Sequence, residues 1–170
     1  MVNLMGSGAI LLEVIEAAKW LSENLGIGCW IWSVTSFTQL KRNALAIERT
    51  NCHHLDKKPE KHFLEKTLST YEAPIVAATD YIRSYAEQIR PFVKEDYYTL
   101  GTDGFGLSDT RKRLRKHFEV DAGYICYTAV LALYRAGRLS RNHLAQVIQS
   151  WSIDLDQNSS MAFDLSKGVN

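Results

Sequence analysis

Short apolar runs alternate with amphipathic helical segments along this chain, and this alternation constrains the fold more than any other feature. The apolar runs are residues 2–5, 27–34, 73–79 and 96–101. Consecutive strands separated by a helix run parallel, because a parallel pair needs a crossover connection, and that crossover is right-handed. The pattern therefore predicts an α/β fold with three layers, in which helices cover both faces of a mostly parallel sheet.

The same runs predict the number and placement of the strands. "IGCWIWSV", residues 27–34, is almost unbroken in apolar character and rich in aromatic and β-branched side chains. Such a run is typical of a central strand that is covered on both faces. "SIDL", residues 152–155, is a candidate for a last strand at the edge. We therefore expect a sheet of about five strands.

Helices are expected between and after these strands. From residue 10 to residue 25 apolar side chains recur at helical spacing, and Gly26 follows as a C′ residue would. Thr79 or Asp80 is a candidate cap for the helix after the third strand, and Ser108 for the basic helix that ends near His117. Further helices are predicted over 37–51, 60–69, 82–89, 122–136 and 140–151, and the longest irregular connection over 52–62.

Composition limits the number of domains and the kinds of partner. The chain has 170 residues, of which 46% are hydrophobic, so we assign residues 1–156 to a single domain and residues 157–170 to a disordered tail. The net charge of +1 gives no overall attraction to nucleic acid. No apolar run reaches the ~18 residues of a membrane span. We therefore expect no nucleic acid and no membrane among the partners.

The three cysteines, Cys29, Cys52 and Cys126, are scattered, and none forms a Cys-x-x-Cys pair. A chain of this length does not need disulfides to hold its core together. We interpret them as reduced thiols of a cytoplasmic protein.

A glycine-rich turn, Gly6-Ser7-Gly8, lies between the first strand and the first helix, where free backbone amides could hold an anion. A dinucleotide site would need a third glycine where Leu11 stands. It would also need an acidic residue at the end of the second strand, where the sequence is Val34-Thr35-Ser36. A plain tight turn is the favoured interpretation.

Cys52, His53, His54 and His62 lie close together in the polar connection and include side chains that zinc or copper prefers. Neighbouring residues rarely aim at one metal ion, and no second pair completes a tetrahedron at finger spacing. We therefore predict an exposed loop and no metal site.

Arg111, Lys112, Arg113, Arg115 and Lys116 make the helix after the fourth strand strongly basic. On a helix these positions spread around most of the circumference, and no aromatic platforms are interleaved with them. We expect a solvated face, from which one or two arginines bridge to a neighbouring domain or subunit.

The segment "AGYICYTAVLALYRA", residues 122–136, is apolar on nearly all sides. Such a helix either forms the centre of the core or shares its surface with a partner. The sequence does not decide between these two roles.

Four stretches together resemble one family, the homodimeric type of pyruvate dehydrogenase, which depends on thiamine diphosphate. They are "LMGSGAILLEVIEAA", "WSVTSFTQLKRNALAIER", "APIVAATDYIRSYAEQIRPFV" and "LGTDGFGLSDTRKRLRKHFEVDAGYI". The resemblance runs from the first strand to about Asp154 and covers only the C-terminal domain of a much longer polypeptide, a domain also found at the end of transketolases. The loop 52–62 and the tail from Gln157 depart from the family pattern.

The resemblance implies that this domain carries no catalytic, cofactor-binding or metal-binding residue, because the two preceding domains hold thiamine diphosphate and magnesium. The sequence agrees, since Thr102-Asp103-Gly104 lacks the first glycine of the family's Gly-Asp-Gly turn and no asparagine pair follows. Nor does the chain show the glutamate that contacts the cofactor's pyrimidine ring.

The function that the resemblance implies is that of a structural and dimerisation domain, inactive alone, in an enzyme that decarboxylates pyruvate and passes the acetyl group to lipoamide. Its partners would be the missing domains and a second subunit, with contact to the dihydrolipoyl acetyltransferase component left open. The candidate interface or anion-binding residues are Asp103, Ser108, Arg111 and Tyr124.

The alternative is a freestanding regulatory module of the same fold that binds an anion or a nucleotide in the crevice at the carboxyl ends of the strands. Its lining would be Ser7, Gly8, Asp80, Ser108 and Arg111. A hydrolase has little support, because the chain has no Gly-x-Ser-x-Gly elbow.

Overall fold

The computed structural model describes residues 1–156. Within this range the sheet has four strands in the order β2-β1-β3-β4, all parallel. The strands are β1 (Val2–Ser7), β2 (Cys29–Ser33), β3 (Ile75–Thr79) and β4 (Tyr97–Leu100). The helices are η1 (Gly8–Ile10), α1 (Leu11–Leu25), α2 (Phe37–His53), α3 (Phe63–Leu68), α4 (Arg83–Glu87), η2 (Arg90–Phe92), α5 (Arg111–His117), α6 (Ala122–Arg135) and α7 (Arg141–Trp151).

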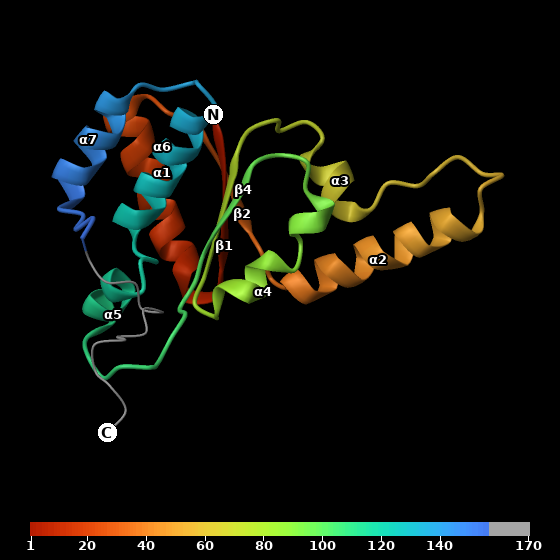
Figure 1. Ribbon diagram of the computed structural model, residues 1–170, viewed down its shortest axis with the longest axis horizontal. Coiled ribbons are helices and arrows are strands. Elements are labelled where there is room, and N and C mark those ends of the chain that lie inside the picture. Colours follow the sequence, from red (N-terminus) through yellow and green to blue (C-terminus); the bar gives the residue numbers. More distant parts are fainter. Residues whose placement is uncertain (157–170) are drawn as a thin grey trace.

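Helices cover both faces of the sheet, as the alternation of runs predicts (Figure 1). Alternate strand residues point to opposite faces, so β1 supplies Leu4 to one core and Met5 to the other. The core on Leu4's face contains α1, α6 and α7, whereas the core on Met5's face contains α2, α3 and α4. The prediction of a three-layer α/β fold is confirmed.

The prediction for the second run is wrong, because β2 lies at an edge of the sheet and not at its centre. Ile31 is 44% exposed, and the two tryptophans of the strand are half-buried. Trp30 and Trp32 both pack edge-on against the ring of Tyr71, with ring centroids 5.0 Å apart in each case. The tryptophans of this edge strand are thus covered on one face by the Tyr71 ring. Hydrophobic periodicity cannot distinguish such an edge strand from a central strand that is covered on both faces.

Residues 152–155 do not form the expected fifth strand. Ser152 has φ 48°, in the left-handed region, and ends α7. Its carbonyl accepts a hydrogen bond from Lys116 Nζ at 3.2 Å, and the Asp154 carbonyl accepts one from Tyr124 Oη at 3.3 Å. Ile153 is buried in the core. The segment therefore closes the α6–α7 side of the domain instead of extending the sheet.

The helix boundaries follow local chemistry with three corrections. Gly26 ends α1 at φ 63°, as expected. Thr110 caps α5, not Ser108, because the Thr110 hydroxyl accepts a hydrogen bond from Arg113 N. Neither Thr79 nor Asp80 caps the helix after β3, since α4 begins at Arg83. The irregular connection begins at His54, because α2 runs on to His53.

The apolar segment 122–136 forms α6, and the structure favours its role as the central helix of the core. α6 packs between α1 and α7 and has more buried residues than any other helix in the described part of the chain. Gly123 lets the Trp151 side chain lie so close that a Cβ there would be 3.0 Å from Trp151 Cβ. This surface is therefore used within the domain.

Candidate functional site

The candidate site is a hollow at the carboxyl edge of the sheet, beside the ends of β1, β3 and β4. The chain leaves β1 and β3, which are neighbours, toward opposite faces, and in parallel α/β sheets ligands bind at such a point. The hollow has a volume of about 510 Å³. Its lining is Ala9, Ile10, Asp80, Thr102, Gly104, Gly106, Leu107, Asp109, Arg111, Leu114, Arg115, Phe118 and Val120.

The turn after β1 holds a carboxylate of the chain itself. Ala9 N donates a hydrogen bond of 3.2 Å to Asp80 Oδ2. Gly8 has φ 61°, and a Cβ at Gly8 would lie 2.5 Å from Asp80 Oδ1. Because Asp80 already occupies the position that an anion would take, and would repel one, the turn does not favour the phosphate or nucleotide of the regulatory-module alternative.

Asp103 joins the two loops that follow β3 and β4. Its Oδ1 accepts a hydrogen bond of 2.8 Å from Arg83 N, a free amide at the first residue of α4. Its Oδ2 lies 3.2 Å from Arg83 Nε. One residue earlier, Thr102 N donates to Tyr81 O at 2.9 Å. Asp103 is therefore a cap for α4, supplied from a distant part of the sequence.

The other three sequence candidates are not brought together. Arg111 is exposed and lines the hollow, whereas Ser108 is exposed and does not line it. Tyr124 is only 6% exposed and lies in α6, where burial raises the pKa of its hydroxyl to about 12. Asp103, Ser108 and Arg111 thus belong to the loop and helix after β4, whereas Tyr124 lies in the core.

A mostly buried ion pair beside the hollow was not identified from the sequence. Arg115 Nη1 lies 2.5 Å from Glu13 Oε1, and the exposed side-chain fractions are 17% and 14%. Glu13 Oε2 also accepts a hydrogen bond of 3.0 Å from Ala122 N, the first residue of α6. Glu13 thus connects the start of α1 to both α5 and α6. One arginine of the basic helix does form a bridge, but within this domain.

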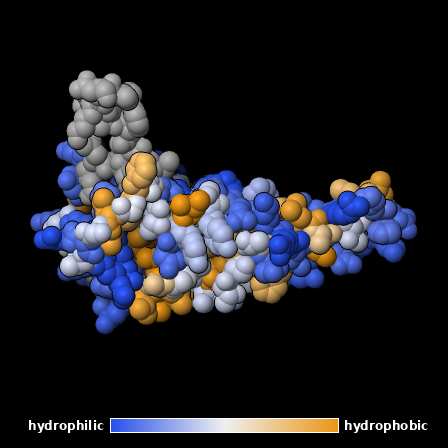
Figure 2. Space-filling model, turned by 90° about the horizontal axis from the view of Figure 1, so that it is seen from below, coloured by the Kyte–Doolittle hydropathy of each residue, from blue (hydrophilic) through white to orange (hydrophobic). Residues whose placement is uncertain are grey.

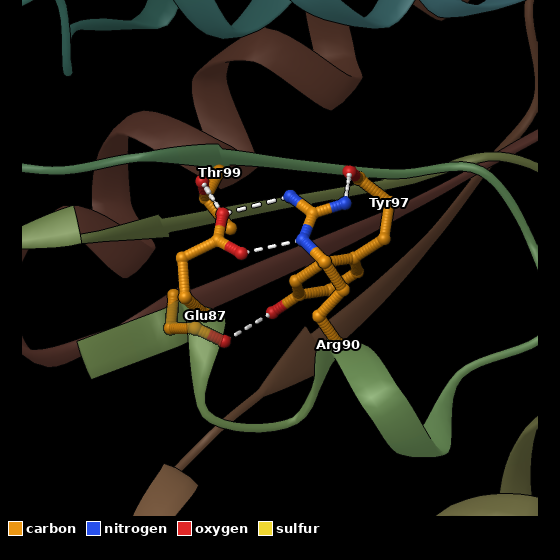
Figure 3. Close-up of polar contacts among 5 residues, drawn as sticks. Glu87, Arg90, Tyr97 and Thr99 are labelled. Carbon is orange, nitrogen blue, oxygen red and sulfur yellow. Dashed lines mark hydrogen bonds and ion pairs between the residues drawn. The ribbon is translucent and has the colours of Figure 1, made fainter. Parts of the chain in front are cut away.

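A second polar cluster connects α4 to β4 (Figure 3). Arg90 donates to both carboxylate oxygens of Glu87, from Nε at 2.5 Å and from Nη2 at 2.7 Å. Arg90 Nη1 donates to Tyr97 O at 2.7 Å, and the Thr99 hydroxyl donates to Glu87 Oε1. The hydrogen bonds from Arg90 hold the pKa of Glu87 below its ordinary value.

Glu87→Gln is expected to remove a pH-dependent part of the stability. Because the folded-state pKa of Glu87 is lowered, its contribution is present above the unfolded-state value of about 4.3 and is lost as pH falls through the folded-state value. We expect the variant to lose about 1 kcal/mol at pH 7, discounted for partial exposure, and less at pH 3. Thermal unfolding across this pH range measures the difference. A loss that is equal at both pH values would contradict the assignment, and Glu72→Gln, at an exposed position, is the control.

Within the described residues, the side chains that could hold a metal ion are dispersed, and the turn after β1 already binds a carboxylate. No three side chains of His, Cys, Asp or Glu within residues 1–156 are grouped so that they could hold a metal ion. His62, one of the four Cys and His candidates, instead accepts a hydrogen bond of 3.2 Å from Glu65 N and caps α3. At the hollow, Asp80 stands where the diphosphate would need donors. Within the same range no helix is long and apolar enough to cross a membrane.

The geometry defines a parallel α/β domain in which Asp80 binds the turn after β1 and several polar side chains join elements of the same domain. The chain belongs to the transketolase-like TK C-terminal domain family, whose model matches residues 1–121. Its relatives include the "Pyruvate dehydrogenase E1 component" of Pseudomonas aeruginosa, with 45% identity over 159 residues. The proteins of the same name from Cupriavidus necator and Escherichia coli share 42% identity over 161 residues and 43% over 157 residues.

These alignments cover nearly all of this chain but a small part of the relatives. They span 93%, 95% and 92% of this chain, and 18% of each relative. The solved structure "Split gene transketolase, inactive beta4 tetramer" aligns with a TM-score of 0.48 and 18% identity, covering 78% of this chain and 38% of that chain.

Proposed function

We propose that this chain acts as the C-terminal structural and dimerisation domain of a homodimeric pyruvate dehydrogenase. The observation that carries the proposal is the 45% identity to an E1 component across 93% of this chain. Residues 1–156 form the domain, and the complete protein works in the cytoplasm. Thiamine diphosphate and magnesium bind to the part of the enzyme outside this chain, which decarboxylates pyruvate and passes the acetyl group to lipoamide on the acetyltransferase component.

The domain contributes architecture and no reacting group. Its hollow carries Asp80 at the anion position, and Glu13, Asp103 and Glu87 each pair with groups of the same domain. Polar side chains remain exposed at the carboxyl edge and are suited to fixing the register of an interface. Charged pairs across an interface contribute more to its register than to its affinity. Ser108 and Arg111 are our candidates for that role.

Complementation in trans tests the proposal. The Pseudomonas aeruginosa relative, shortened by the segment that matches this chain, is mixed with increasing amounts of this chain. Pyruvate-dependent reduction of an electron acceptor is then followed with thiamine diphosphate and magnesium present. We expect a saturable rise in rate. The relative's own excised segment is the positive control, and if that segment restores the rate while this chain does not at any concentration, the proposal is wrong.

A further inference from the structure

Large apolar side chains stand exposed on two neighbouring loops at the carboxyl edge of the sheet. Tyr81 and Ile82 follow β3 and are 59% and 55% exposed, while Phe105 and Leu107 follow β4 and are 93% and 53% exposed. We call these four residues the edge patch. Figure 2 looks onto this side of the molecule and shows hydrophobic side chains at the surface among polar ones. Isolated soluble domains rarely leave such side chains grouped unless they bind something.

The two loops of the edge patch are joined at their bases by hydrogen bonds within the domain. Asp103 caps α4 across the gap between them, and Thr102 bonds to the carbonyl of Tyr81. The Tyr81 ring stacks on the Tyr85 ring, with centroids 5.0 Å apart. Because these contacts order the Tyr81 side of the patch before binding, that side loses less conformational entropy when a partner arrives.

The hollow beside the patch has the character of a protein interface. Leu107 belongs to both, and Ile10, Leu114, Phe118 and Val120 add further apolar lining. Since Asp80 disfavours a small anion there, an apolar side chain of a partner is the better occupant. An exposed aromatic residue next to an apolar hollow is the arrangement from which energetic anchors of interfaces are built.

We propose that the edge patch docks this domain onto the cofactor-binding part of the longer protein, with Phe105 entering an apolar pocket there. This inference rests on the proposed function, which supplies the partner. The chain spans 18% of the relatives' length, so most of the complete protein lies outside it and is available as that partner. The polar residues Ser108 and Arg111 lie at the rim of the patch, and Phe105 is the anchor.

Phe105→Asp tests the inference with Leu55→Asp as the matched control. Both side chains are exposed, at 93% and 88%, so neither substitution removes packing from the domain. Leu55 lies in the loop after α2, which Figure 1 shows projecting away from the edge that carries Phe105. The melting temperature of each variant is measured first. Binding of the full 170-residue chains to the shortened relative is then measured by calorimetry.

We expect Phe105→Asp to weaken binding by at least about tenfold, because a carboxylate cannot enter an apolar pocket unpaired. Leu55→Asp should bind like the wild type, and both variants should have the melting temperature of the wild type.

Equal binding by Phe105→Asp and the wild type would overturn the inference and leave the proposed function standing. Equal weakening of binding by both variants would also overturn the inference. If the wild-type chain forms dimers that Phe105→Asp abolishes while partner binding is unchanged, the patch is a self-association site and the inference is wrong. Failure of the wild-type chain to bind would refute the proposed function and remove the partner from the inference.

Discussion

Glu13→Ala is expected to cost about 2–3 kcal/mol of the free energy of unfolding, because it leaves the mostly buried charge of Arg115 without its partner. Arg115 would retain only a long contact of 3.4 Å to the Ala9 carbonyl, and Ala122 N at the start of α6 would lose its acceptor. For a chain of this size the midpoint of thermal unfolding should fall by roughly 4–12 °C. Calorimetry or circular dichroism measures this shift.

Glu23→Ala on the same helix is the matched control. Glu23 pairs with Lys19 at 4.0 Å, but both side chains are mostly exposed, so we expect a change of less than about 0.5 kcal/mol. Arg115→Ala and the double variant complete a cycle that isolates the coupling between Glu13 and Arg115. If the two effects of the cycle simply add, or if Glu23→Ala costs as much as Glu13→Ala, the buried pair does not join α1 to α5 in the manner described.

Gly101→Ala is expected to destabilise the domain by about 2–4 kcal/mol, because the new methyl group meets backbone that cannot rotate away. Its Cβ would lie 2.5 Å from Arg83 N, 2.7 Å from Arg83 Cα and 2.8 Å from Tyr81 O. Relief of these contacts would separate the loops after β3 and β4, and with them the Asp103 cap of α4. The midpoint of thermal unfolding should fall by roughly 4–16 °C.

Gly106→Ala, in the same glycine-rich loop, distinguishes this mechanism from a general need for flexibility. A Cβ at Gly106 meets nothing within 4 Å, so this substitution should be neutral or slightly stabilising. If both alanines cost the same, the close approach of Gly101 to Arg83 is not the cause. If Gly101→Ala melts like the wild type, the loops tolerate separation and the Asp103 cap contributes little.

The layers of the fold could be predicted from the sequence, because they depend on the hydrophobicity of contiguous residues. Apolar runs and helical spacing located all four strands and the principal helices within residues 1–156. The same local pattern wrongly predicted β2 at the centre of the sheet. The ring that covers Trp30 and Trp32 belongs to Tyr71, which is far from them in the sequence. The prediction of a fifth strand failed because Lys116 and Tyr124, also distant in sequence, donate hydrogen bonds to the carbonyls of residues 152 and 154.

The site could be predicted only in part for the same reason. Asp103 was identified as an interface candidate, but its partner Arg83 lies 20 residues away, and no local rule connects the two. Arg115 and Glu13 are 102 residues apart, and only the folded chain shows that this one arginine of the basic helix is buried. Asp80 was placed in a possible anion site, where its carboxylate turns out to bond to Ala9 N in that position.

The central position of β1 has a consequence for the order in which this domain can be made. Within this domain β1 is synthesised before the other three strands, yet one of its neighbours in the sheet is β3, with Asn3 beside Ile75. During synthesis β1 therefore waits for roughly 70 further residues before both of its edges are paired, and its Glu13 anchor waits longer for Arg115. Pairings between segments so distant in sequence slow folding. The nascent domain should consequently remain incomplete until α5 and α6 have emerged, which makes this stretch of synthesis the interval in which a chaperone would have the most exposed sheet to protect.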